Sequence, residues 1–250
     1  MVLSFDGLAQ DINRKKGSFQ KTVLAIQELL KYPNIELETN SVFTHDTIEY
    51  LSESIELILK LGVSGINFSL SVIDPWDRSS LVRLNDEMTK LVRIVRSHDK
   101  RNGHIPVVNF REENGKGIFY CAAGQDRLAV TPEGKVWGCY LFPDYFYGKE
   151  SLPDYKKFSF GDLDNFISNH RKIFPRISSN YARLSMDNFS TAQIKCLFCS
   201  DLENCTVCPI NASFSGSPLG KIPSHVCEIQ KILINQTKAF RKNIRDGVSP

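Results

Sequence analysis

All seven cysteines of this 250-residue chain lie at or beyond position 121, and their spacing constrains the fold more than any other feature. They are Cys121, Cys139, Cys196, Cys199, Cys205, Cys208 and Cys227. Four of them form a Cys-x2-Cys-x5-Cys-x2-Cys run between positions 196 and 208. An odd number of thiols cannot pair completely in disulfides, and such density in a chain without secretory features points to metal. The spacing predicts a C-terminal region that binds two iron-sulfur clusters.

Composition indicates a globular protein, with 42% hydrophobic residues and a net charge of +3. The N-terminal ten residues lack a basic stretch followed by an apolar one, and no segment reaches the roughly 18 apolar residues of a membrane span. We therefore expect a cytoplasmic protein with no membrane partner. The basic residues are dispersed along the chain, so we expect no nucleic-acid partner either.

The first hundred residues alternate between strand and helix signals. Extended runs at 2–5, 35–43 and 65–72 are each followed by apolar residues at helical spacing; the first two helices begin near Ser18 and Thr47, and the third includes 84–95. Three strand–helix units with short connections imply parallel strands, with functional loops at the carboxyl ends. The fold class that we predict is α/β, a partial (half) TIM-type β/α barrel with one exposed sheet edge.

The second half reads differently. Two short strands at 127–130 and 135–138 flank the turn 131–134, which is a hairpin signal, and 228–244 reads as a closing helix. The predicted domains are a partial barrel over 1–100, a linker over 101–118 and a small α+β cysteine-rich domain over 119–250.

The complete cysteine pattern resembles a known family. Cys121-x12-Gly134-x4-Cys139, followed by the four-cysteine run and Cys227, is similar to the SPASM domain of radical S-adenosylmethionine (SAM) enzymes. One spacing departs from that family, with two residues between Cys205 and Cys208 in place of the usual three.

The resemblance implies two auxiliary 4Fe-4S clusters. It places Cys196, Cys199, Cys205 and Cys227 on a distal cluster, and Cys121, Cys139 and Cys208 on a proximal one. Three thiolates leave one iron of the proximal cluster to be completed by a substrate atom, by water or by a side chain such as His104.

The N-terminal segment resembles the same enzymes independently. Residues 4–19 are similar to the fourth strand and following helix of the radical SAM barrel, 40–44 to the fifth strand, and 62–66 to the entry of the sixth. The resemblance implies that Ser4, Arg14 and Asn40 lie near the ribose and carboxylate of SAM.

One departure outweighs the match. The Cys-x3-Cys-x2-Cys loop that radical SAM chemistry depends on is absent from this sequence. The chain alone is therefore not expected to cleave SAM. Three explanations stay open: an incomplete or truncated gene, which a start at Met1 just before the fourth strand favours; a subunit whose first half is encoded separately; or a protein that lacks the chemistry.

Two classes of function follow. The first is the C-terminal portion of a radical SAM/SPASM enzyme of peptide maturation, whose implied partners are a peptide or protein substrate, a separate half-barrel subunit and a reductant such as ferredoxin or flavodoxin. The second is a non-catalytic iron-sulfur or zinc module for electron transfer or interaction. Zinc would leave three cysteines unexplained, and the gap of five residues is short for two zinc knuckles.

Several other residues were weighed as functional candidates. Sulfatase-maturing members of the family carry an aspartate directly after the equivalent of Cys139, and Tyr140 at this position counts against that activity. We interpret Asp11 as a helix cap, Trp137 as core and the segment 74–76 as a turn. The five histidines are scattered, which does not suggest a catalytic zinc site.

Overall fold

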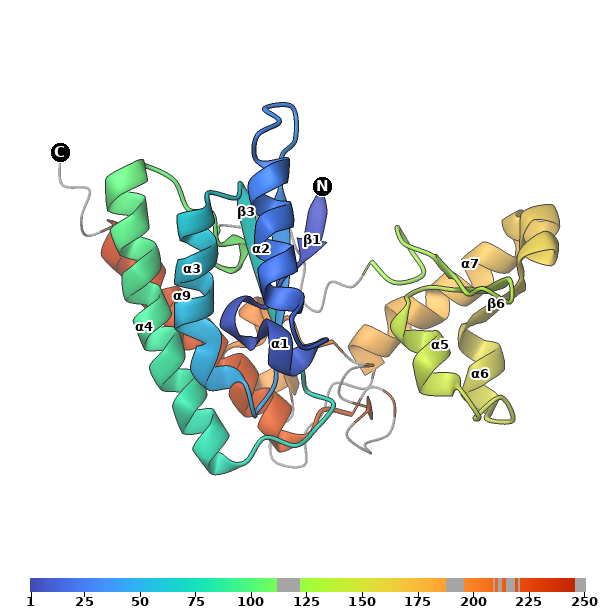
Figure 1. The fold of residues 1–250 in the computed structure, drawn as a ribbon. Helices are drawn as coiled ribbons and strands as arrows, with labels where there is room; N and C mark the ends of the chain where they lie inside the picture. The colour runs from blue at the N-terminus through green and yellow to red at the C-terminus, as the bar shows by residue number, and fades with distance from the viewer. Residues whose placement is uncertain are drawn as a thin grey trace. The chain divides into compact units, whose positions relative to one another are not determined.

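The computed structural model describes residues 1–111, 122–187, 196–208, 210, 213–214, 219 and 221–245. The chain divides into two compact units (Figure 1). The first comprises Met1–Gly115 together with Glu228–Pro250, and the second comprises Lys116–Cys227. The C-terminal helix therefore belongs with the N-terminal unit, whereas the sequence grouped it with the cysteine-rich region.

The first unit contains a parallel sheet and its covering helices. Its strands are β1 (Val2–Ser4), β2 (Glu38–Phe43) and β3 (Gly65–Leu70). Its helices are α1 (Gln10–Asn13), α2 (Ser18–Leu29), α3 (Leu51–Leu61), α4 (Arg78–Asn102) and α9 (Ser224–Arg245), which begins at the end of the second unit; short 3-10 turns are η1 (Gly7–Ala9), η2 (Ile48–Tyr50) and η3 (Val108–Phe110).

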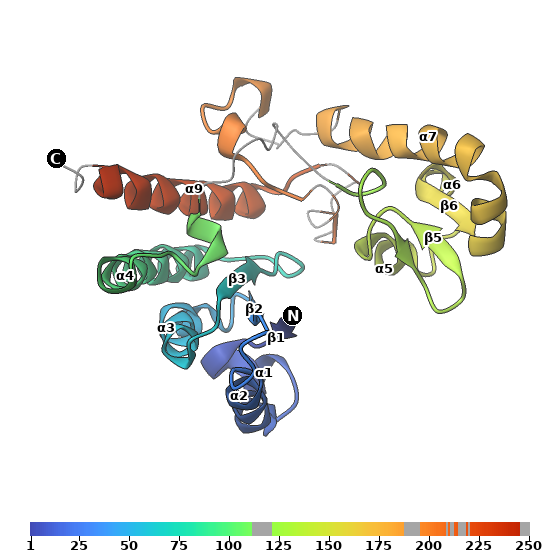
Figure 2. The same ribbon diagram turned by 90° about the horizontal axis from the view of Figure 1, so that it is seen from above.

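The sheet has the order β1-β2-β3, and both pairs are parallel. This confirms the predicted succession of strand and helix, because parallel neighbours require a crossover between them. The helices α2, α3 and α4 lie along one side of the sheet (Figure 2). Thr39, Ser41 and Phe43 alternate along β2 and are all buried, as expected for the face that packs on helices.

The predicted helices are present, but their ends are set by other residues than the sequence suggested. The N-cap of α2 is Gly17, and Asp11 holds the first turn by accepting hydrogen bonds from the backbone N–H groups of Gly17 (2.9 Å) and Phe19 (2.8 Å). These bonds lower the pKa of the Asp11 carboxyl, Phe19 contributing most. The predicted capping role of Asp11 is confirmed.

The third helix, α4, is longer than its apolar stripe indicated. It ends at Asn102, where Gly103 takes the left-handed conformation with φ of 69°, so the first two residues of the predicted linker over 101–118 are helical. Polar residues of this helix contact α9: the Arg96 guanidinium donates to the carbonyl of Ala239 at 2.6 Å, and Gln236 donates to Thr89 at 3.0 Å. A polar face that binds a neighbouring helix does not show in hydrophobic periodicity.

The second unit holds a small antiparallel sheet of order β4-β5-β6. Its elements are β4 (Ala129–Val130), β5 (Lys135–Trp137), α5 (Leu141–Phe146), α6 (Pro153–Phe158), β6 (Ser159–Asp162), α7 (Leu163–Asp187), which is kinked at Asn169, and the 3-10 turns η4 (Cys196–Phe198) and η5 (Leu202–Asn204). The hairpin of β4 and β5 confirms the prediction, and Gly134 in its turn has φ of 76°, a conformation that favours glycine.

The core of this unit is aromatic. Trp137 is stacked on Phe146 with 5.5 Å between ring centroids and is 2% exposed, which confirms the core interpretation of this tryptophan. Phe158 and Tyr181 pack edge to face at 5.1 Å in the same cluster. No helix within the described residues is both long and apolar enough to cross a bilayer.

Candidate functional site

A row of polar side chains crosses the face of the parallel sheet opposite Thr39 and Ser41. Ser4, Asn40 and Asn67 are direct neighbours in the register of the three strands. The Asn67 amide donates to the Asn40 side-chain oxygen at 2.9 Å. Ser4 is exposed and Asn40 is half-buried, so this row is accessible along the sheet. The structure thus brings together two of the three residues predicted to lie near SAM.

Arg14, the third of these residues, is engaged at the carboxyl end of β1. Its guanidinium forms a two-pronged ion pair with Asp6, at 2.7 and 3.2 Å. Asp6 is 1% exposed and also accepts a hydrogen bond from the Val42 N–H at 2.8 Å. The pair therefore ties β1 to β2 where the strands end.

The cysteines that the structure describes are all partly buried. Burial is the main cause that raises the pKa of Cys205 to about 11; a hydrogen bond from the Val207 N–H opposes the shift, and the nearby thiols of Cys196, Cys227 and Cys199 add to it. Burial, followed by Cys227 and Cys199, also raises the pKa of Cys196. These four thiols therefore form one electrostatic group.

Cys139 and Cys208 form a second pair. Both pack against the aromatic core of the second unit. Partial burial raises the pKa of the Tyr140 phenol, and the two thiols raise it further, so both lie close to this side chain. The family resemblance implies Cys139 and Cys208 in one ligand set and Cys196, Cys199, Cys205 and Cys227 in the other, and these two assignments stay predictions. Cys121 lies outside the described residues, and ligation itself stays a prediction.

The donor chemistry fits a thiolate-bound metal centre. A bound cation stabilises buried thiols as thiolates, because its positive charge offsets both the burial and the mutual repulsion that raise their pKa. Among the residues that the structure places, no three His, Cys, Asp or Glu side chains already converge on a coordinating geometry. Metal binding would therefore have to draw the loops around Cys196 and Cys205 together.

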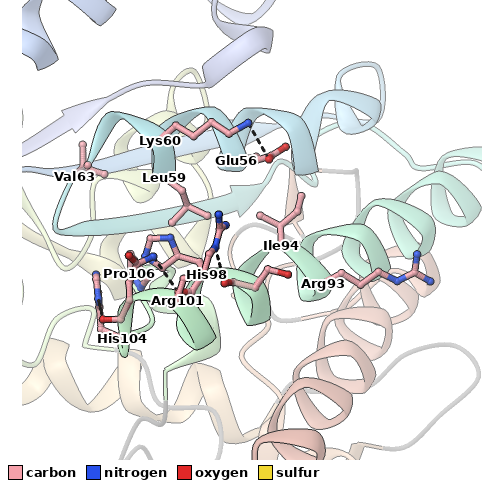
Figure 3. A pocket seen from close by; sticks show the side chains of 13 residues that line it. Glu56, Leu59, Lys60, Val63, Arg93, Ile94, His98, Arg101, His104 and Pro106 are labelled. Atoms are coloured by element: carbon pink, nitrogen blue, oxygen red, sulfur yellow. Dashed lines mark hydrogen bonds and ion pairs between the residues drawn. The ribbon is translucent and has the colours of Figure 1, made fainter.

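His104, named as a possible cluster ligand, lies in the first unit. Its Nδ1 atom is 3.2 Å from the carbonyl oxygen of Asn102, and its ring packs edge-on against His98 with 5.1 Å between centroids. His98, Asn102 and His104 line a cavity of about 600 Å³ between the C-terminal ends of α3 and α4 (Figure 3).

This cavity is at the amino ends of the strands, because its lining residues Gly62 and Val63 directly precede β3. Two of its cations have structural partners: Lys60 pairs with Glu56 at 2.9 Å, and Arg101 donates to the carbonyl of Ser97 at 3.0 Å. Basic residues in the last turn of a helix offset its dipole. We therefore interpret the charges here as support for the helix ends, since sites on parallel sheets lie at the opposite end.

Two residues of the candidate sites were missed in the sequence. Asn67 is a polar residue in a largely apolar strand, which is a visible signal in the sequence. Only the strand register shows that it is a neighbour of Asn40. Tyr181 belongs to a polar helix and gives no signal, yet its ring packs under Gly138, beside Cys139; a Cβ atom on Gly138 would be 2.5 Å from its Cζ.

The predicted turn at 74–76 is confirmed as irregular chain, with the Trp76 indole donating to the Ser71 carbonyl at 2.8 Å.

The fold and the site define a mixed α/β protein with a parallel sheet and a separate thiol-rich unit. No family model matches the sequence, and no curated protein matches it significantly. Among solved structures, the fold is similar to that of hexahistidine-tagged anSMEcpe with bound AdoMet, with a TM-score of 0.65 and 15% sequence identity. The match covers 99% of this chain and 66% of that one, so the chain spans just under two thirds of the length of anSMEcpe. Identity at this level establishes the shared fold alone.

Proposed function

We propose that this chain is the C-terminal portion of a radical SAM/SPASM enzyme that modifies a peptide or protein and binds two auxiliary 4Fe-4S clusters. The observation that carries the proposal is the division of the described thiols into a group of four and a group of two. The similarity of the fold to a protein with bound AdoMet, which is S-adenosylmethionine, supports it further.

In this proposal the four-thiol group holds the distal cluster with all positions filled by cysteine. Cys139 and Cys208, with Cys121, hold the proximal cluster and leave one iron without a cysteine. Bound clusters of this kind transfer electrons, and an iron without a protein thiolate can bind a substrate atom. The aromatic core beside Cys139 and Cys208 limits water access on that side of the pair.

The SAM-binding part of the proposal concerns the sheet. Ser4, Asn40 and Asn67 offer hydroxyl and amide groups in one row, and Arg14 offers a cation near the end of β1. Amides and hydroxyls suit a ribose, and a guanidinium suits a carboxylate. We further propose that cleavage of SAM requires a Cys-x3-Cys-x2-Cys loop supplied by a separate polypeptide, and an electron from a reductant such as ferredoxin or flavodoxin.

Metal analysis of oxygen-free protein tests the clusters. We expect about eight irons and eight sulfides per chain, since each cluster contributes four of each. Cys205→Ala and Cys208→Ala are each expected to lower the iron content to about four, through loss of the distal and the proximal cluster respectively. Ser200→Ala, at an exposed position between Cys199 and Cys205, serves as the matched control and should leave the iron content unchanged.

A second function is favoured by the grouping of four thiols alone. Cys196, Cys199, Cys205 and Cys227 could bind a single zinc ion in a non-catalytic interaction module, because four thiolates complete a tetrahedral site. One zinc per chain with no sulfide would support this alternative and overturn the cluster proposal.

A further inference from the structure

The second unit contains an open groove that the proposed cluster site does not use. It lies among α6, β6 and α7, which are neighbours in this unit (Figure 1), and has a volume of about 990 Å³. Its floor is apolar, with Phe160 and Ile177 buried beneath it. None of the six cysteines that the structure describes lines it.

The charge of this groove is strongly one-sided. Five basic residues line it against one acidic residue, Asp162, which Lys135 already neutralises at 2.6 Å. Lys157 is 3.9 Å from the Asp154 carboxylate. The remaining three cations, Lys156, Lys172 and Arg176, form no ion pair with any other residue that the structure places.

Five cations and amides of α7 line the groove: Asn165, Asn169, Lys172, Arg176 and Asn180. Beyond the kink at Asn169, Lys172, Arg176 and Asn180 recur every four residues and so follow one face of the helix. Lys172 and Arg176 are one turn apart, and like charges at this spacing destabilise a helix. An anionic ligand would offset the repulsion between Lys172 and Arg176. Binding of such a ligand would therefore explain why two cations lie one turn apart on this helix.

The amides offer a second kind of contact. The Asn169 side-chain amide donates to the Asn165 side-chain oxygen at 3.0 Å. The amide hydrogens of the Asn165 side chain and the side-chain oxygen of Asn169 have no partner among the residues that the structure describes. One donor and one acceptor side by side match the peptide group, which also carries one of each. Tyr155 adds an aromatic surface at the same groove.

We propose that this groove docks an acidic segment of a polypeptide, with its carboxylates on Lys156, Lys172 and Arg176 and its peptide groups on Asn165 and Asn169. The inference extends the proposed function, because the docked polypeptide is the one to be modified, and in that sense it rests on it. The docking itself uses none of the proposed cluster ligands.

A nucleic acid is the less suitable occupant. Sequence-independent binding of a phosphate backbone requires a track of many cations, and the groove offers three that are not already paired. The small net charge of the chain also provides little long-range attraction for a polyanion.

Fluorescence anisotropy with the full chain tests the proposal. The probe is a fluorescein-labelled peptide of about 12 residues with the repeat Glu-Val-Gly. It is compared with a Lys-Val-Gly peptide of the same length and with a thymidine oligonucleotide that has the same net negative charge as the acidic peptide. We expect the acidic peptide to bind, its affinity to fall as salt is added, and the other two probes to bind at least about tenfold more weakly.

Charge reversal then locates the contact. Lys172→Glu combined with Arg176→Glu is expected to weaken binding of the acidic peptide about tenfold or more, and to create binding of the Lys-Val-Gly peptide, a gain that an unfolded variant cannot show. Arg171→Glu is the control for the single Lys172→Glu variant, because it makes the same charge change on the same helix. Arg171 lines a different hollow, with Phe166 and Phe174, and its variant should retain wild-type affinity.

Three results would overturn the proposal: no binding of the acidic peptide, equal loss of affinity in the Arg171 variant, or tighter binding of the oligonucleotide. The outcome is separable from that of the cluster proposal. Protein stripped of metal and the Cys205→Ala variant should both bind the peptide as the wild type does. Metal analysis therefore detects the absence of clusters, and fluorescence anisotropy independently detects the absence of docking.

Discussion

The Tyr181 hydroxyl accepts a hydrogen bond from the backbone N–H of Gly138 at 2.9 Å, one residue before Cys139. The same hydroxyl donates to the carbonyl of Phe158 at 2.7 Å, so one side chain joins α7 to the end of β5 and to the end of α6. Tyr181 is 3% exposed, and these bonds are therefore shielded from water. The backbone that leads into Cys139 is fixed by this contact.

Removal of the hydroxyl should destabilise the second unit. Tyr181→Phe leaves the Gly138 N–H and the Phe158 carbonyl buried without this partner, and we expect the free energy of unfolding to fall by about 1–3 kcal/mol in urea denaturation. Tyr147→Phe, at a site that is 86% exposed, should change it by less than about 0.5 kcal/mol. Equal effects of the two variants would contradict this account.

The buried carboxylate of Asp6 should be critical for the first unit. Asp6→Asn leaves the Arg14 guanidinium without its counter-charge, and we expect a loss of about 2–4 kcal/mol, below the loss for a fully buried pair because the Arg14 side chain is 36% exposed. Glu28→Gln breaks the exposed pair with Lys31, which is 2.6 Å long, and should cost less than about 1 kcal/mol. Thermal unfolding of the two variants distinguishes a buried from a surface ion pair.

His98 should make stability depend on pH. Burial lowers its pKa from 6.5, and the nearby His104 and Arg101 lower it further, against a smaller opposite effect of Asp99. The unfolded chain thus binds a proton at higher pH than the folded one, so the stability contribution is complete above about pH 6.5 and is lost as the pH falls towards the folded pKa. His98→Asn should flatten the decrease of Tm between about pH 7 and pH 5.

A matched histidine provides the control for that experiment. His170→Asn changes an exposed residue on α7 and should leave the dependence of Tm on pH as in the wild type. An unchanged slope in the His98 variant would disprove the assignment.

The raised pKa of Cys205 predicts slow alkylation of this thiol in metal-free protein. At pH 8 a thiol of pKa about 11 is ionised roughly 100-fold less than one of pKa 9, and the thiolate is the reactive form. Iodoacetamide should therefore label Cys205 about 100-fold more slowly in the folded protein than in urea, as followed by mass spectrometry of its peptide. Labelling at the same rate in both states would show that the thiol is neither buried nor close to the other cysteines.

The sequence was most informative where a single period dominates. The apolar spacing in α2 and α3 predicted these helices, because one face of each packs on the core, and the extended run at 35–43 predicted the region of β2. The hairpin at Gly134 was equally clear from its turn residues. Local patterns of this kind carry their own signal.

Long-range pairing explains what the sequence could not predict. Helix α7 was missed because Pro175 and many polar residues hide its apolar face, and Tyr181 acquires its role through bonds to residues 23 and 43 positions away. The proximity of Cys227 to Cys205 is a further long-range relationship, because more than twenty residues separate them in the sequence.

The assignment of α9 to the N-terminal unit has a consequence for biosynthesis. Phe240, fully buried, packs against Phe110 at 4.7 Å, so the hydrophobic interior of that unit stays incomplete until α9 leaves the ribosome. The intervening thiol-bearing region has been translated by then, and it can fold while the preceding portion is still unfinished. Maturation of this polypeptide would then proceed from the middle of the chain outwards.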